Sequence, residues 1–196
     1  MNWKRLIVSG AVAGMFLATV GLTFGQGQSD FEIKEIRQQL VTAPTGISAG
    51  DLGGTPATLW RQWLKIEVLF ASNPTWSDDV QVKYYVLLSD LKGDRKLFVG
   101  DVTHVNVAKG SQHYSAMFMH PNAVQRYGGK IPLVVTARIF YKGAVVAEKT
   151  MAPGISVIEG WWDKFSPISG YLLSPQETPW APVANDRFEA IKVSHQ

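Results

Sequence analysis

Short apolar segments separated by turn residues follow one another over residues 30–159. The clearest segment is residues 80–89, where the side chains of one parity are all apolar: Val80, Val82, Tyr84, Val86 and Leu88. Alternation with a period of two places such side chains on one face of a β-strand. Residues 30–40, with a shift of phase near Glu35, and residues 58–72 predict two more strands.

The middle of the chain predicts a longer run of strand structure. Residues 97–110 form one predicted strand, which we expect to be interrupted at Gly100 by a β-bulge, and residues 111–121 form the next. The sequence NPTWSDD, residues 73–79, predicts a turn because Asn, Pro and Asp favour turn conformations.

Glycines mark three further connections. Residues 121–129 predict one helical turn that ends at its two glycines, and residues 130–152 predict a hairpin around Lys142 and Gly143. Residues 42–56 are rich in Gly, Pro, Thr and Ser and predict an irregular loop.

The pattern as a whole predicts an all-β fold. Six to eight strands, with no helical pattern of ten or more residues between them, favour an antiparallel two-sheet sandwich. We expect an immunoglobulin-like sandwich of about seven strands over residues 30–159, and a barrel stays open as an alternative because strand order is not readable from one sequence. Residues 160–196 predict an extended Pro- and Trp-rich tail that packs on the sandwich or on a partner.

The N-terminus has the pattern of an export signal. Lys4 and Arg5 precede an uncharged run over residues 6–25, so residues 1–25 are a predicted signal peptide, with an uncleaved membrane anchor as the alternative. The chain contains no cysteine, which excludes a disulfide framework and thiolate metal ligands. We expect an exported protein of the periplasm or cell surface of a Gram-negative-type bacterium.

Charge and candidate chemistry narrow the function further. Without residues 1–25 the chain has 17 basic against 16 acidic residues with no long basic patch, which argues against a nucleic-acid partner. His113 and His120 are seven positions apart on one predicted strand, so their side chains face opposite sides, and His104 has no third ligand by spacing. Ser111 and Ser169 lie in ordinary turns rather than in a nucleophile elbow. We therefore expect half-exposed strand histidines, no catalytic residue, no metal site and no cofactor.

The tail carries the candidate interaction residues. These are large aromatic groups and one arginine in a segment held extended by prolines: Trp161, Trp162, Phe165, Tyr171, Trp180, Arg187 and Phe188. Three interpretations remain open. The tail covers an edge strand or an open end of its own core, it docks on a partner protein, or Trp161, Trp162 and Trp180 form a platform for sugars.

The end of the tail also resembles a known family. The pattern Leu-Leu, Thr-Pro-aromatic-Ala-Pro and Asp-Arg-aromatic-Glu is met by Leu172, Leu173, Thr178, Pro179, Trp180, Ala181, Pro182, Asp186, Arg187, Phe188 and Glu189. In this respect the chain is similar to the immunoglobulin-like, type IV pilus-associated exported proteins of Verrucomicrobia, the Akkermansia type. A pilin leader cut after Gly10 would place Met15 where a major pilin has glutamate, so we do not expect the chain to polymerise as a pilin.

What the resemblance implies is a non-enzymatic cell-envelope protein. We expect an accessory or structural component associated with a type IV pilus or secretion assembly, with envelope, pilus or secretion proteins as partners. The alternative is a secreted module that binds glycans such as mucin sugars. Contact with a membrane is expected only through an uncleaved N-terminal segment.

Overall fold

The computed structural model describes residues 29–44, 62–129, 131–184 and 186–192. The predicted signal peptide, residues 1–25, and most of the predicted loop at 42–56 lie outside the described residues. Within the described part, none of the helices has the length and apolar character needed to cross a bilayer.

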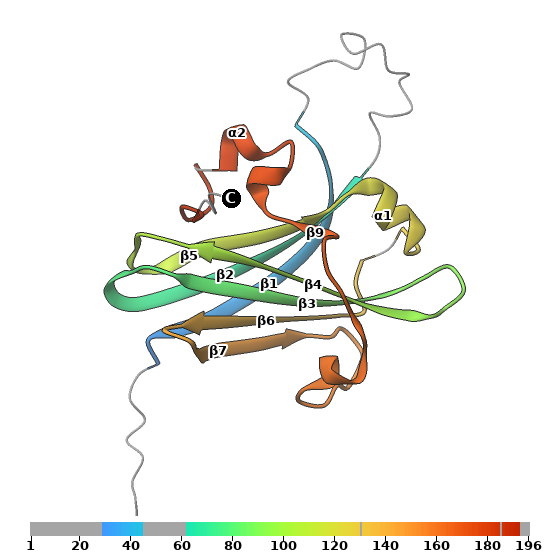
Figure 1. Ribbon diagram of the computed structural model, residues 1–196, viewed down its shortest axis with the longest axis horizontal. Coiled ribbons are helices and arrows are strands. Elements are labelled where there is room, and N and C mark those ends of the chain that lie inside the picture. The colour runs from blue at the N-terminus through green and yellow to red at the C-terminus, as the bar shows by residue number, and fades with distance from the viewer. Residues whose placement is uncertain (1–28, 45–61, 130, 185, 193–196) are drawn as a thin grey trace, which may run out of the picture.

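The strands form two packed sheets rather than one closed sheet (Figure 1). The first sheet has the order β1-β2-β5-β9, with bounds Phe31–Thr42, Gln62–Ser77, Val107–Met119 and Leu172–Leu173. The second has the order β7-β6-β3-β4-β8, with bounds Ala144–Met151, Val134–Tyr141, Val80–Ser89, Arg95–His104 and Pro167–Ile168. Neighbouring strands are antiparallel except β4 and β8. The predicted all-β sandwich is confirmed.

The core lies between the sheets, and strand β3 shows how the sequence builds it. Val82, Tyr84 and Val86 point into the core and are fully buried. Tyr85 and Leu87 have the opposite parity, yet they are also buried because the C-terminal tail covers them. A strand covered on both faces requires a nearly continuous apolar run, which the sequence YYVLL supplies.

Several local predictions are confirmed. The β1–β2 register shifts between Ile33 and Glu35, where the sequence changes phase. Strands β6 and β7 form the expected hairpin, with Lys142 at φ 52° and Gly143 at φ 79°. Helix α1, Pro121–Arg126, ends in a turn whose Gly129 has a left-handed φ of 63°.

Two features of residues 97–110 were predicted wrongly. No bulge occurs at Gly100, because the β3–β4 register runs unshifted through it; a Cβ there would lie 2.7 Å from Cβ of Leu172, so the glycine makes room for the tail. Strand β4 ends at His104, and the chain reverses through Asn106, whose φ is 55°. The single predicted strand over 97–110 is thus two strands in different sheets.

The segment NPTWSDD is mostly strand rather than turn. Strand β2 continues to Ser77, and Trp76 pairs with Ala108 of β5. The pairing is irregular between Ser72 and Trp76, and such an irregularity accommodates Pro74 inside a strand. The reversal itself occurs at Asp79, whose φ is 57°.

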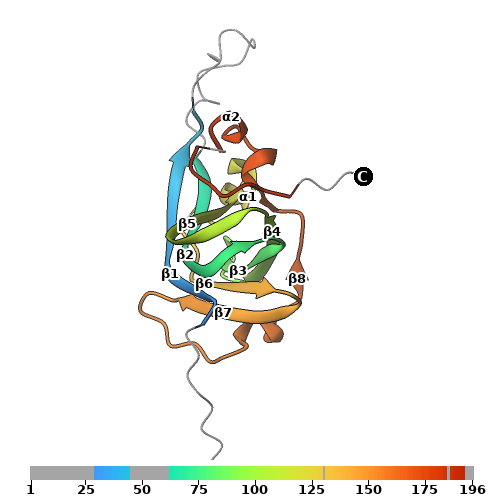
Figure 2. The ribbon, with the colours of Figure 1, turned by 90° about the vertical axis from the view of Figure 1, so that its left-hand side faces the viewer.

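The C-terminal tail spans one side of the sandwich (Figure 2). It begins with a 3-10 turn, η2 at Trp161–Lys164, adds β8 to the edge of the second sheet, and then adds β9 to the edge of the first. A second turn, η3 at Pro175–Glu177, and the short helix α2, Ala181–Ala184, follow. The last described residues return to β4, where His104 forms a bridge with Ile191. The tail therefore covers an edge strand of each sheet.

Candidate functional site

The seven candidate interaction residues do not form one site. Trp161, Trp162 and Phe165 lie on the outer face of the second sheet, and Tyr171 lies beside α1. The remaining three residues gather on the outer face of the first sheet: Trp180, Arg187 and Phe188. The three locations are therefore separate candidate sites.

Trp161 and Trp162 cover the outer face of the second sheet. The Trp161 indole Nε1 donates a hydrogen bond to Oγ1 of Thr136 at 2.8 Å. Trp162 stacks on Tyr85 with 4.8 Å between ring centroids, and the Arg138 guanidinium lies over its ring. Both tryptophans are buried, so neither offers the exposed ring face that a sugar platform needs.

An apolar cavity opens beside Trp161, and we call it the Trp161 groove. Its volume is about 260 Å³, just under the roughly 300–1,000 Å³ that is usual for small-molecule sites. Its lining is Leu87, Arg95, Leu133, Val134, Ile155, Ser156, Val157, Ile158, Trp161, Lys164 and Phe165. Ile155 and Ile158 are 42% and 59% exposed, so the groove continues into an exposed apolar surface. Arg95 and Lys164 are its charged members, and both are positive.

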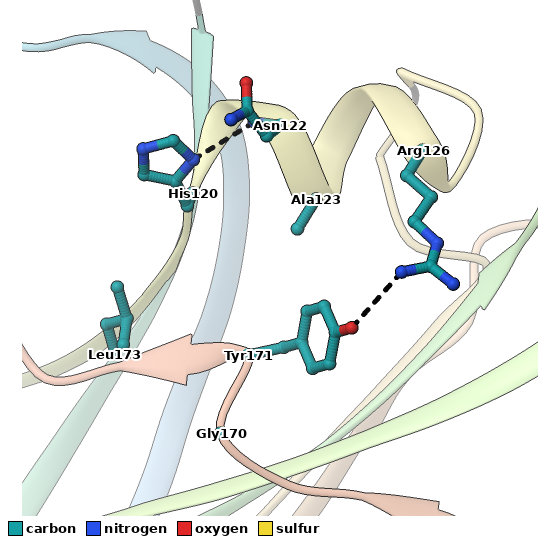
Figure 3. Close-up of a pocket in the computed structure, with 7 residues that line it drawn as sticks. All are labelled: His120, Asn122, Ala123, Arg126, Gly170, Tyr171 and Leu173. Carbon is teal, nitrogen blue, oxygen red and sulfur yellow. Dashed lines mark hydrogen bonds between the residues drawn. The ribbon is translucent and has the colours of Figure 1, made fainter.

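Tyr171 lines a second cavity of about 290 Å³ between α1 and the tail (Figure 3). Figure 3 shows the Tyr171 hydroxyl directed at Arg126, whose Nη1 donates to it at 3.4 Å. On the other side of the cavity, His120 caps α1 by accepting a hydrogen bond from the backbone N–H of Asn122. The Tyr171 ring packs edge-on against Phe98, which indicates an anchor for the tail.

The third cavity lies between the first sheet and α2, and we call it the Trp180 pocket. Its volume is about 350 Å³. Its lining is Gln39, Val41, Thr42, Lys65, Phe118, Trp180, Val183, Arg187 and Phe188. Trp180 stacks on Phe118 with 4.6 Å between ring centroids and stays partly exposed, unlike Trp161 and Trp162.

A buried carboxylate next to this pocket holds the tail in place. Arg187 donates from Nε and Nη2 to the two carboxylate oxygens of Glu67, each at 2.9 Å, and Lys65 also donates to that carboxylate. Burial by itself raises the pKa of Glu67, but the hydrogen bonds from Arg187 and Lys65 outweigh it and hold the pKa below its usual value. Glu67 is therefore ionised and shared by two cations.

A second polar chain joins both sheets to the tail. The Tyr84 hydroxyl donates to Oγ of Ser115 at 2.7 Å, and Ser115 lies 2.8 Å from Nε2 of His104. Nδ1 of His104 lies 3.2 Å from the carbonyl oxygen of Glu189, and a carbonyl only accepts. The neutral ring must then carry its proton on Nδ1, so Ser115 donates to Nε2. Burial lowers the pKa of His104, which keeps this neutral form.

Two of the histidines, His104 and His113, are thus more buried than we expected, whereas His120 is exposed. His104 is fully buried and His113 is 7% exposed, because the returning tail covers them: Nδ1 of His113 contacts Oε1 of Glu189 at 2.8 Å. His113 lies on β5 whereas His120 lies outside it, at the start of α1. In the part of the chain that the structure describes, no three His, Asp or Glu side chains gather as a metal site would require.

Sequence reasoning missed Lys65, Glu67 and Ser115. Lys65 and Glu67 alternate with Leu64, Ile66 and Val68, and that spacing places the two charges on the outer face of β2. The signal was present, but a charged outer face is usually solvated. Only the position of the tail shows that these charges are covered.

Known proteins resemble the chain over both the sandwich and the tail. One family model matches residues 25–195. A crystal structure of a protein from Akkermansia muciniphila is similar, with a TM-score of 0.67 and 21% identity over 84% of this chain and 94% of that one. At this identity the structural similarity shows a shared fold. None of the curated proteins matches the chain.

Proposed function

We propose that the chain, which belongs to the family whose model matches residues 25–195, is a non-enzymatic cell-envelope protein that acts by protein–protein interaction. It serves as an accessory or structural component of a type IV pilus or secretion assembly. The family match supports a role related to the cell envelope. The protein is exported to the periplasm or the cell surface, as the pattern of residues 1–25 predicts.

The observation that carries the proposal is the exposed apolar surface at the Trp161 groove. Ile155 and Ile158 present 42% and 59% of their surface to solvent beside a cavity floored by buried apolar side chains. Contiguous exposed apolar surface next to buried aromatic groups is typical of protein interfaces. Arg95 and Lys164 add positive charge, which favours a partner with acidic residues around an apolar centre.

Crosslinking and pull-down from native envelopes test this proposal. The bait is the full tagged chain, and the test variant is the double substitution Ile155→Asp and Ile158→Asp. An unpaired carboxylate buried in an apolar contact costs more than about 1.4 kcal/mol, the equivalent of a tenfold loss, so recovery of pilus or secretion proteins falls at least about tenfold. The control is Val145→Asp, because Val145 is 42% exposed on β7 and lies outside the groove lining.

Two outcomes would contradict the proposal. Equal recovery by the test and control variants, with both proteins folded, would show that the groove is not the interface. An intact mass that retains residues 1–25 in every fraction would argue against release into the periplasm.

A further inference from the structure

We propose that the Trp180 pocket binds a carboxylate of a partner polypeptide, an Asp or Glu side chain that lies beside an apolar residue. Lys65 and Arg187 bind the carboxylate, and Trp180 with Phe188 contacts the apolar neighbour. The pocket lies on the outer face of the first sheet, whereas the Trp161 groove lies on that of the second. The proposed carboxylate site is therefore separate from the proposed interface at the Trp161 groove.

The charges of three side chains at the pocket do not cancel. Lys65 and Arg187 both pair with Glu67, so these three groups carry one positive charge in excess. Lys65 and Glu67 are 7% and 3% exposed, and charge buried to that extent is costly unless it is balanced. A second carboxylate would balance it.

Lys65 and Arg187 have more N–H donors than Glu67 uses. An ammonium has three N–H groups and a guanidinium has five. Glu67 accepts one hydrogen bond from Lys65 and two from Arg187. Donor capacity thus remains on both side chains, and the Arg187 side chain is 52% exposed, so a ligand reaches it from solvent. Arg187 also lies over the ring of Tyr114, which restricts where its plane points.

The wall of the Trp180 pocket is mostly apolar. Val41, Phe118, Trp180, Val183 and Phe188 are apolar, and Gln39 and Thr42 are the neutral polar members of the lining. Val183 is 48% exposed at the pocket. A sugar acid needs many hydrogen-bonding partners for its hydroxyls, whereas an apolar side chain next to an acid needs contact area and a cation. A volume of about 350 Å³ accommodates such a pair of side chains.

The test is a titration of the full chain by NMR, followed on the indole N–H signals. The probe is the blocked dipeptide acetyl-Phe-Asp-amide, and its matched control is acetyl-Phe-Asn-amide, which has the same shape without the charge. The Trp180 signal is assigned by its loss in Trp180→Phe. We expect a saturable shift of this signal with the Asp peptide and at least tenfold weaker binding of the Asn peptide.

Variants of the protein locate the binding charge. Lys65→Met keeps an unbranched side chain of similar length and leaves the Arg187–Glu67 pair intact, so the excess charge disappears and binding of the Asp peptide falls at least tenfold. Lys83→Met is the control, because Lys83 lies over Tyr85 on the other sheet. Ile155→Asp with Ile158→Asp leaves peptide binding unchanged, which separates this site from the Trp161 groove.

Three results would overturn the inference. They are equal binding of the Asp and Asn peptides, unchanged binding by Lys65→Met, and tighter binding of glucuronic acid than of the Asp peptide. The comparison of the two peptides on the unsubstituted protein keeps the inference testable even if Lys65→Met does not fold.

Discussion

Replacement of Ser115 by alanine tests the buried chain that links the two sheets to the tail. Ser115 is fully buried, accepts from Tyr84 and donates to His104. Ser115→Ala leaves both the Tyr84 hydroxyl and Nε2 of His104 without a partner. Burial raises the pKa of Tyr84, so its hydroxyl stays protonated and cannot relieve the loss by ionising. Each unpaired buried group costs about 1–3 kcal/mol, so for two groups we expect a loss of about 2–6 kcal/mol in the free energy of unfolding.

Tyr84→Phe is the matched control. It removes one hydroxyl from the same chain, but Ser115 still donates to His104, so nothing that must donate is left unpaired. We expect a loss of about 1 kcal/mol, the net value of an ordinary hydrogen bond.

Urea unfolding followed by tryptophan fluorescence measures both values. With a slope of about 1–3 kcal/mol per M, Ser115→Ala lowers the midpoint by about 0.7 M or more. If Ser115→Ala is no more destabilising than Tyr84→Phe, then Ser115 does not donate to His104, and the assigned tautomer is wrong.

Two further predictions concern the stability of the protein at low pH and the packing of the tail. Because burial lowers the pKa of His104, the unfolded chain binds a proton at higher pH than the folded one, and stability falls as the pH drops below about 6.5, by up to about 1.4 kcal/mol per pH unit. Urea midpoints at pH 7.5, 6.5 and 5.5 measure this loss. Gly100→Ala places a Cβ 2.7 Å from Cβ of Leu172 and 2.8 Å from Cε of Met117, so β9 must shift, at a cost of about 1–3 kcal/mol. Protease sensitivity of the tail, together with the urea midpoint, detects that shift.

Both predictions have simple counter-results. A midpoint that does not change between pH 7.5 and 5.5 would show that His104 is not held neutral. A Gly100→Ala protein that is as stable and as protease-resistant in its tail as the unsubstituted protein would contradict the close approach of the tail. Gly93→Ala is the control for backbone strain, because Gly93 lies in the turn between β3 and β4 with a φ of 90° and open surroundings, so we expect it to lower the urea midpoint without exposing the tail to protease.

Local patterns predicted most of the strands. Alternation in residues 80–89 marks β3 to the residue, and the phase shift near Glu35 marks the irregularity in β1. The hairpin turn at Lys142 and Gly143 was also predicted correctly from the sequence. These features depend on the side-chain period and on the backbone preferences of neighbouring residues, and a few adjacent residues determine both.

Boundaries failed where a distant segment decides them. Gly100 looks like a bulge in isolation, but it lies in a regular ladder, and its small size serves Leu172, which is far along the chain. Pro74 looks like part of a turn, but the irregular pairing between Ser72 and Trp76 holds it in β2. In both cases the deciding neighbour is distant in sequence.

By itself, then, the sequence determined the strand periodicity, the all-β class and the aromatic character of the tail. Tertiary structure decided where that tail lies: Arg187 meets Glu67 across 120 positions, and Glu189 meets His113 across 76. It also decided that Trp161 is buried and that Trp180 lines a charged pocket. The physical reason is that burial and ion pairing depend on which surfaces come together, and strand order, which no local period encodes, brings them together.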